Sequence, residues 1–266
     1  MGQTKTWHHG LVARWWGEFN HGGEDIAWFQ SVIESYGEPV LDAGCGTGRL
    51  LIPYLRAGLD VDGSDASPDM LSWCGDAAKS EGFSPNLYPQ SMHELDLPRT
   101  YRTIVNCGAF GLGGGREEDL EGLRRIHRHL EPGGAFAFDY YLPNFDERAW
   151  LAWLPEHRPE MPRRWPSTSD RREAADGSVL ELRSRRVAFD PLGQSYTAEL
   201  RVDHLDGDEL VAREEYSLTA QIYFQPELLL MLKVAGFNDV RVTAGFENRA
   251  PRPWEDGYLT FIALRG

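Results

Sequence analysis

Three glycines separated by single residues follow a short apolar segment near the start of the chain. Gly44, Gly46 and Gly48 come directly after a predicted strand at Val40–Asp42, and a predicted helix at Arg49–Ala57 follows them. Glycine has no Cβ atom, so a ligand can approach the backbone of such a turn closely. A strand, a glycine turn and a helix in this order indicate an α/β fold with a ligand site at the turn.

The alternation of strand and helix continues over the next ninety residues. Ser67 before Pro68 is typical of a helix start, because a hydroxyl caps the first turn and proline fits the first position. The predicted strands are Asp60–Gly63, Asn86–Tyr88, Thr103–Cys107 and Ala135–Tyr140, and the helices between them include Pro68–Ser80 and Glu117–His129. This pattern predicts a doubly wound parallel sheet.

The remainder of the chain divides into an N-terminal helical part, an insertion and a return to the α/β pattern. Two helices are predicted at Leu11–Phe19 and Glu24–Tyr36. After Tyr141 we expect short helices and loops over Leu142–Asp176, then a three-strand antiparallel meander at Val179–Phe189, Ser195–Leu205 and Glu209–Phe224. The pattern resumes with a helix at Pro226–Ala235, a C-cap at Gly236, and strands at Asp239–Ala244 and Tyr258–Leu264. We therefore expect an N-terminal helical lid at 1–37, a core at 38–141 and 222–266, and an insertion at 142–221.

The spacing of the glycines restricts the ligand. A dinucleotide turn reads GxGxxG, but here the spacing is GxGxG, and no lysine-containing P-loop follows. Asp42, two residues before the first glycine, would repel a pyrophosphate and suits an ammonium or sulfonium group. Asp65 lies about twenty residues further on, where an acid can accept both hydroxyls of a ribose. A ligand with adenosine and positive charge but no phosphate is S-adenosylmethionine.

Three motifs then resemble a known family. The segments VLDAGCGTGRL, DVDGSDASPDML and HRHLEPGG are similar to those of the class I S-adenosylmethionine-dependent methyltransferases and follow in the same order. The resemblance covers residues 38–140 most strongly and implies a Rossmann-like sheet of seven strands with the last strand antiparallel. It also implies that the N-terminal helices fold over the cofactor.

The same resemblance implies the cofactor-binding residues. Asp42 and the three glycines would surround the methionine part of the cofactor, and Asp65 would bind the ribose. The residues expected around the adenine and at the edges of the turn are Ala66, Met70, Ser91, Met92, Cys45 and Cys107. The family's usual acid after the third strand is missing, because this stretch reads Gln90-Ser91-Met92.

The methyl acceptor should lie beyond the ends of the fourth and fifth strands. Members that methylate bases or glutamine carry a Pro-Pro-aromatic turn after the fourth strand, which Asn106–Ala109 lacks. Candidate bases are His9, Asp139 and Tyr140, with His93 as a further one, and candidate substrate-binding residues are Trp15, Trp16, Phe110 and Tyr141. Each aromatic residue could equally be part of the core, and each polar one a structural hydrogen-bonding group.

Composition excludes several other functions. A formal net charge of −14 disfavours a nucleic-acid or anionic-membrane partner, and no stretch approaches the roughly 20 apolar residues of a membrane span. The three cysteines have neither disulfide nor metal spacing, so we expect free thiols in a cytoplasmic protein. Asp60, Asp62 and Asp65 do not share one face of a strand, so no metal site is predicted.

The sequence therefore predicts transfer of a methyl group from S-adenosylmethionine to nitrogen or oxygen of a small molecule. The inserted meander could shape the acceptor pocket or form a homodimer contact. Two alternatives remain open at this stage. One is a non-catalytic binding or scaffold protein that keeps the fold, and the other is a nicotinamide-dependent oxidoreductase, which the glycine spacing and Asp42 disfavour.

Overall fold

The computed structural model describes residues 6–143, 147–207 and 209–266. Its helices are α1 Gly10–Phe19, α2 Glu24–Tyr36, α3 Leu51–Arg56, α4 Pro68–Ser80, η1 Met92–Glu94, α5 Arg116–His129, α6 Glu147–Leu151, η3 Pro155–His157 and α7 Gln225–Ala235. Its strands are β1 Val40–Ala43, β2 Val61–Ser64, β3 Leu87–Tyr88, β4 Tyr101–Asn106, β5 Leu130–Tyr141, β6 Asp170–Glu173, β7 Val179–Asp190, β8 Ser195–Asp206, β9 Glu209–Gln221, β10 Asp239–Ala244 and β11 Tyr258–Leu264.

The larger sheet has seven strands in the order β10-β11-β5-β4-β1-β2-β3. Strand β11 runs antiparallel to both of its neighbours, and the other strands are parallel. The predicted Rossmann-like sheet with an antiparallel last strand is therefore confirmed. Ser67 also caps α4 as predicted, since its hydroxyl accepts a hydrogen bond from the Met70 amide at 3.2 Å.

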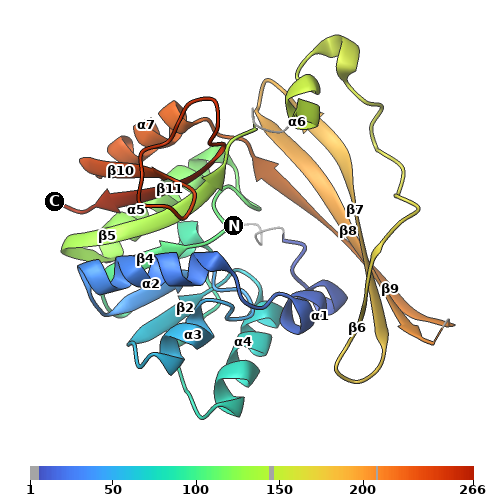
Figure 1. Cartoon of the computed structure of the whole chain (residues 1–266), viewed down its shortest axis with the longest axis horizontal. Coiled ribbons are helices and arrows are strands. Elements are labelled where there is room, and N and C mark those ends of the chain that lie inside the picture. The colour runs from blue at the N-terminus through green and yellow to red at the C-terminus, as the bar shows by residue number, and fades with distance from the viewer. Residues whose placement is uncertain (1–5, 144–146, 208) are drawn as a thin grey trace.

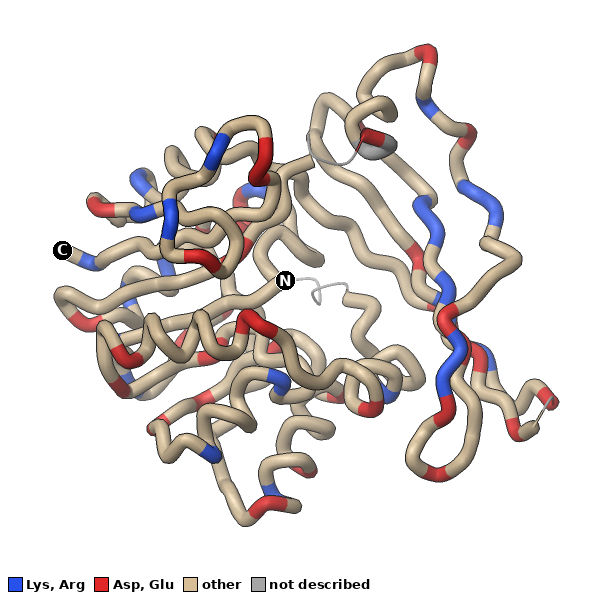
Figure 2. The backbone as a smooth tube through the Cα atoms, viewed as in Figure 1, with Lys and Arg blue, Asp and Glu red and all other residues tan. Residues whose placement is uncertain are grey.

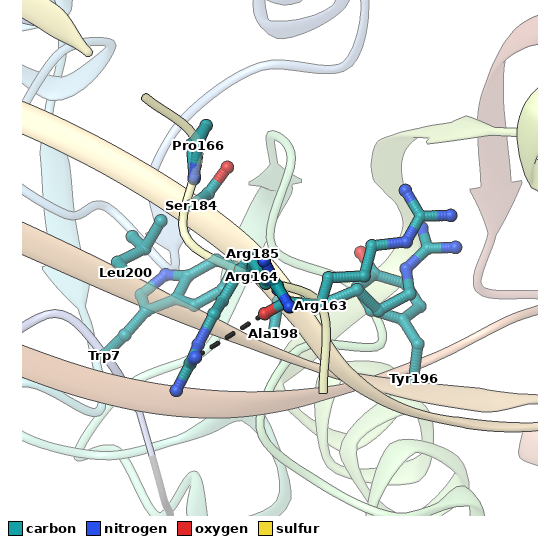
Figure 3. Close-up of a pocket in the computed structure, with 10 residues that line it drawn as sticks. Trp7, Arg163, Arg164, Pro166, Ser184, Arg185, Tyr196, Ala198 and Leu200 are labelled. Carbon is teal, nitrogen blue, oxygen red and sulfur yellow. Dashed lines mark hydrogen bonds between the residues drawn. The ribbon is translucent and has the colours of Figure 1, made fainter. Parts of the chain in front are cut away.

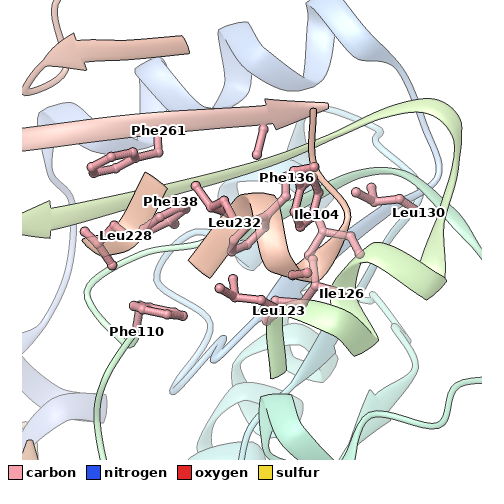
Figure 4. Packing of buried hydrophobic residues seen from close by; sticks show 14 of the residues in the cluster. Ile104, Phe110, Leu123, Ile126, Leu130, Phe136, Phe138, Leu228, Leu232 and Phe261 are labelled. Atoms are coloured by element: carbon pink, nitrogen blue, oxygen red, sulfur yellow. The ribbon is translucent and has the colours of Figure 1, made fainter. Parts of the chain in front are cut away.

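Apolar side chains fill both faces of this sheet. On one face, α5 and α7 cover a stack of phenylalanines in which the rings of Phe138 and Phe261 lie 4.7 Å apart (Figure 4). On the other face, α2, α3 and α4 pack against the buried side chains of β1, β2 and β4. The strands are buried because helices cover both sides, as the near-continuous apolar runs of a parallel sheet require.

The second sheet is antiparallel, has the order β6-β7-β8-β9 and stands beside the first one (Figure 1). The three predicted strands are present, but β6 adds a fourth within a segment where we expected short helices and loops. All four residues of β6 are charged and exposed, so the sequence carries no alternation of polar and apolar residues there. Backbone pairing with β7 forms this edge strand instead.

Helix α1 lies against both α4 and the second sheet. Its side chains Val12 and Trp15 are buried against Leu180, Leu200 and Val202 of β7 and β8. No helix in the described ranges is long and apolar enough to cross a membrane. The division into a lid, a core and an insertion stays a prediction.

Candidate functional site

The glycine turn after β1 adopts a conformation that only glycine takes without strain. The φ angles of Gly44, Gly46 and Gly48 are 82°, 56° and 89°. A Cβ atom on Gly44 would lie 2.9 Å from the Cβ atom of Ala109. The Gly44 and Cys45 amides both donate to the Ser64 carbonyl, at 2.7 and 2.9 Å, which holds the turn against the end of β2.

Asp65 follows β2 and closes the turn from the other side. One of its carboxylate oxygens accepts a hydrogen bond from the Gly46 amide at 3.0 Å, and the other accepts from the Ser67 amide at 2.8 Å. Burial raises the pKa of Asp65, and these two hydrogen bonds oppose that shift. Each oxygen keeps acceptor capacity, so the carboxylate can still receive the hydroxyls of a sugar.

A cavity of about 610 Å³ lies over this turn. This size falls within the range of small-molecule and cofactor sites. The predicted cofactor residues that line it are Asp42, Gly44, Cys45, Gly46, Asp65, Met70 and Cys107. Gly48 does not line it and instead packs near Cys74, which a Cβ atom on Gly48 would approach to 2.9 Å.

A smaller cavity of about 90 Å³ continues past Asp65. The residues predicted to surround an adenine, Ala66, Ser91 and Met92, line it together with Gly44 and Asp65. Ser91 stands directly before Met92, where the family's acid is expected, and its hydroxyl donates to Glu94 at 2.6 Å.

These two cavities fit an adenosine bearing a charged amino-acid tail. The glycine turn leaves space that a side chain would fill, and Asp65 faces that space with free acceptor capacity. The indole nitrogen of Trp16 is buried beside the larger cavity and has no hydrogen-bond partner among the described residues. Burial raises the pKa of Asp42 to about 7, so a positively charged ligand would favour its ionised form.

The N-terminal histidines differ from the expectation. His9, the predicted base, turns towards α4, where its Nδ1 lies 3.7 Å from Asp69, and it lines none of the described cavities. Its neighbour His8 lines both cofactor cavities instead. Burial and the nearby His9 lower the pKa of His8 to about 4, so the His8 ring is neutral at physiological pH.

Arg49 and Asp25 form a buried ion pair that the sequence did not predict, and both residues line the cofactor cavity. The Arg49 guanidinium donates to Asp25 at 2.5 and 2.9 Å and to the Gly22 carbonyl at 3.0 Å. Burial acts to raise the pKa of Asp25, but the hydrogen bond from Arg49 acts in the opposite direction, and the pKa lies below its ordinary value. Arg49 thereby joins the N-terminal helices to the end of the glycine turn. The contact joins α2 to the turn before α3, and no local sequence pattern indicates it.

Cys107 lies next to this ion pair. Its thiol donates to Asp25 at 3.1 Å, and burial together with the charge of Asp139 raises its pKa. The Cys107 thiol therefore stays protonated and lines the cofactor cavity.

Asp139, at the end of β5, lies where the cofactor cavity meets a third cavity of about 400 Å³ and lines both. Its oxygens accept hydrogen bonds from the Gly108 amide at 2.8 Å and from the Tyr258 hydroxyl at 2.5 Å. Burial raises the pKa of Asp139 while these two bonds oppose the shift. Tyr258 was not predicted, although pairing of β11 with β5 places it opposite Tyr141.

The third cavity has aromatic walls. The predicted residues Phe110, Tyr140 and Tyr141 line it, and the residues not predicted are Trp153, Phe189, Tyr196 and Ile222. The Tyr140 hydroxyl is fully used, because it donates to the Gln221 carbonyl at 3.1 Å and accepts from the Tyr223 amide at 2.9 Å. Burial also raises the pKa of Tyr140, so its environment is that of a structural tyrosine and not of a base.

The two tryptophans that we predicted to bind the substrate lie in different environments. Trp16 lines the cofactor cavity, whereas Trp15 packs in the cluster between α1 and the second sheet and lines none of the described cavities. The core interpretation, kept open from the sequence, therefore suits Trp15. His93 lines the small cavity beside Ser91 and does not line the third cavity, which has aromatic walls.

Comparisons with known proteins agree with this geometry. A family model described as a methyltransferase domain matches residues 40–134. An uncharacterized methyltransferase of Synechocystis sp. is 32% identical over 158 residues, which cover 56% of this chain and 68% of that protein. The cypemycin N-terminal methyltransferase of Streptomyces sp. is 34% identical over 128 residues, 47% of this chain and 50% of that protein.

The chain thus spans about half the length of the first curated relatives that it matches. Among solved structures, the S-adenosylmethionine-bound amino pentose methyltransferase CalS10 from Micromonospora echinaspora has a TM-score of 0.63 at 17% identity. That alignment covers 98% of this chain and 99% of the other. A likeness at this level of identity establishes the fold.

Proposed function

Because this chain belongs to the class I S-adenosylmethionine-dependent methyltransferases, we propose that it methylates an amine nitrogen of a small molecule bound in the aromatic cavity. The cofactor supplies an electrophilic methyl group on a sulfonium centre. The observation that carries the proposal is the position of Asp139, whose carboxyl group lines both the cofactor cavity and the aromatic cavity.

Asp139 can orient an amine and take its proton. An amine arrives largely protonated at neutral pH and must lose a proton before its lone pair can attack. In the proposed step the nitrogen forms a bond to the methyl carbon, the electron pair of the carbon–sulfur bond stays on sulfur, and the ammonium proton passes to Asp139. Gly108 and Tyr258 hold the carboxylate in place throughout.

The charge of the cavity supports an amine over a phenolate. The carboxyl groups of Asp42, Asp65 and Asp139 line the cofactor cavity, and Arg49, which also lines it, is paired with Asp25. An acidic wall stabilises a cationic acceptor and repels an anionic one. The aromatic side chains beyond Asp139 add surfaces that a cationic amine can approach face-on.

The open aromatic cavity supports catalysis over the scaffold alternative. A protein that only kept the fold would have no need for an unfilled space between the cofactor cavity and Phe110. The names of two relatives refer to a peptide N-terminus and an amino pentose, so amines occur among the acceptors of similar proteins. A homodimer and a cytoplasmic location, both expected from the sequence, stay predictions.

The test measures S-adenosylhomocysteine formation with paired acceptors that differ only in carrying an amine or a hydroxyl group. We expect turnover with amines, and Asp139→Asn to lower kcat/KM at least about 100-fold while S-adenosylhomocysteine binding changes little. Tyr258→Phe keeps the carboxylate but removes one of its partners, so its loss should be smaller, about tenfold.

Turnover with hydroxyl acceptors alone, or full activity of Asp139→Asn, would overturn the amine assignment. Loss of S-adenosylhomocysteine binding in Asp139→Asn would instead make Asp139 a cofactor-binding residue. Calorimetry on each variant separates these outcomes from a failure to bind the cofactor.

A further inference from the structure

Four arginines gather around a cavity of about 570 Å³ lined by β7 and β8 of the second sheet (Figure 3). Arg163 and Arg164 come from the segment before β6, and Arg185 and Arg186 come from β7. Figure 2 shows basic positions along both of these segments. The remaining lining residues are Trp7, Pro166, Ser184, Tyr196, Ala198 and Leu200.

Backbone contacts hold the two arginine pairs together. The Arg163 amide donates to the Arg186 carbonyl at 2.9 Å, so the segment before β6 runs beside β7. The Arg186 guanidinium lies 4.7 Å from the centre of the Tyr196 ring. Arg185 lies 4.4 Å from the ring of Trp165 and bonds to Glu199 at 2.7 Å. The cluster is thus built by the sheet and its aromatic neighbours.

Three of these charges have no acidic partner in the part of the chain that the structure describes. Within the described ranges, no carboxylate forms an ion pair with Arg163, Arg164 or Arg186, whereas Arg185 pairs with Glu199. A second arginine cluster, on α5, is different, because Arg125 and Arg128 lie 2.9 and 3.0 Å from Glu121.

An unneutralised cluster is unusual in a chain whose formal net charge is −14. Holding like charges around one cavity costs Coulomb energy, which an anionic ligand offsets. The arginine cavity also adjoins the aromatic cavity, because Arg186 and Tyr196 line both. One ligand can therefore extend from Asp139, past the aromatic walls, to the arginines.

We propose that the acceptor is a phosphorylated amine, whose phosphate or diphosphate ester is bound by Arg163, Arg164 and Arg186. This inference rests on the proposed function, since it assigns the far end of the same acceptor. Guanidinium groups bind phosphate oxygens in bidentate pairs, and three unpaired cations match a group carrying two or more negative charges. The acidic end of the ligand path then holds the amine, and the basic end holds the phosphate.

The test uses inorganic pyrophosphate as the probe, titrated into the full chain by calorimetry with and without S-adenosylhomocysteine. We expect a Kd below about 1 mM at low salt, weakening as salt rises. The double variant Arg163→Gln with Arg164→Gln, and the single variant Arg186→Gln, should each weaken binding at least about tenfold. Arg186→Lys keeps the charge and should recover part of that loss.

The matched control for the double variant is Arg124→Gln with Arg128→Gln on α5, where the two guanidinium groups lie 4.0 and 3.0 Å from Glu121; it removes the same charge and should leave pyrophosphate affinity unchanged. Equal weakening in this control, or no weakening in the cluster variants, would overturn the inference. Malonate binding as tightly as pyrophosphate would assign the cavity to carboxylates and overturn the phosphate assignment.

S-adenosylhomocysteine binding is measured on the same samples and keeps the two proposals apart. If that ligand binds and pyrophosphate does not, the phosphate inference fails while the methyltransferase function stands. If amine-dependent turnover is absent although pyrophosphate binds at the arginines, the amine proposal fails and an anion site remains.

Discussion

The two sheets of this protein are stabilised in different ways. Every residue of β1 is buried, and helices cover both faces of the larger sheet. Most residues of β7 are half-buried or exposed, and ion pairs link its neighbours across the strands. Examples are Arg185 with Glu199, Arg201 with Glu215 and Arg213 with Asp203, at 2.7, 2.7 and 2.6 Å.

This difference corresponds to the different ligands that we propose for the two cavities. The cofactor cavity is built on the densely packed sheet, where side chains have little freedom to move. The arginine cavity, where we propose that the far end of the acceptor binds, is built on the sheet with many charges, where a substitution should cost little stability. A constant cofactor suits the first environment, and a variable acceptor suits the second.

The largest expected effect is on the packed sheet. Phe138 is fully buried and its ring lies 5.0 Å from Phe136 and 4.7 Å from Phe261. Phe138→Ala should lower the free energy of unfolding by about 3–5 kcal/mol, because it leaves a cavity. Denaturant unfolding measures this, with Leu192→Ala, at a side chain 95% exposed, as the control. A loss below about 1 kcal/mol would break the comparison between the sheets.

The next effect depends on pH and concerns Asp42. Its pKa is about 7 in the folded protein against 3.8 as the ordinary value, so between these values only the folded state holds the proton. Stability should therefore fall as pH rises from about 4 to 7, by up to about 4 kcal/mol. Asp42→Asn cannot ionise and should lack this loss.

Unfolding of both proteins at pH 5 and pH 7.5 checks the prediction. Buried acids that do not interact with Asp42, such as Asp119, contribute equally to both proteins and cancel in the difference. The same pH dependence in Asp42→Asn and the unaltered protein would show that Asp42 is not the group responsible.

The third effect is confined to the cofactor cavity. Gly46→Arg should weaken S-adenosylhomocysteine binding more than about 100-fold, or about 2.7 kcal/mol, because the side chain enters the cavity. The matched control is Gly58→Arg, at a glycine with a φ of 80° and nothing within 4 Å of its Cβ position. Both substitutions place a side chain at a glycine with positive φ. A difference in S-adenosylhomocysteine affinity between the two variants, measured by calorimetry, therefore reports the position of the residue and not backbone strain. Retained binding in Gly46→Arg would contradict the site.

The smallest effect is expected on the sheet with many charges. Glu215, whose side chain is 40% exposed, pairs with Arg201 across β8 and β9. Glu215→Gln should change the free energy of unfolding by less than about 1 kcal/mol, since ion pairs with an exposed partner contribute little. A loss as large as that of Phe138→Ala would remove the contrast between the sheets, and denaturant unfolding measures it.

The sequence predicted the parts of the molecule that local patterns specify. Strand β10, strand β11 and helix α4 begin and end at the predicted residues, because apolar periodicity, Ser67 and the flanking glycines mark them. Strand β6 was missed, because Asp170–Glu173 has no apolar side chain and owes its conformation to its neighbour.

The same limit applies to the candidate site, because residues of one motif can be predicted and contacts between distant segments cannot. Asp65, Gly44 and Gly46 lie within one contiguous motif and line the cofactor cavity, whereas Gly48 does not. The pairing of Asp25 with Arg49 and the contact of Asp139 with Tyr258 join segments 24 and 119 residues apart, which no local pattern reports. His8 and His9 are adjacent in sequence, so only the path of the backbone decides which one faces the cavity.

The hydroxyl of Tyr140 has a consequence for how such proteins could be remodelled. It bonds to Gln221 and Tyr223, so the point where the chain leaves β5 is joined to the point where β9 ends. A segment whose two ends meet can be exchanged as a unit without opening the sheet that carries it. Grafting the stretch between Tyr141 and Ile222 from a relative would then replace the aromatic and arginine cavities together, provided that α1, which packs against β7 and β8, is exchanged with it.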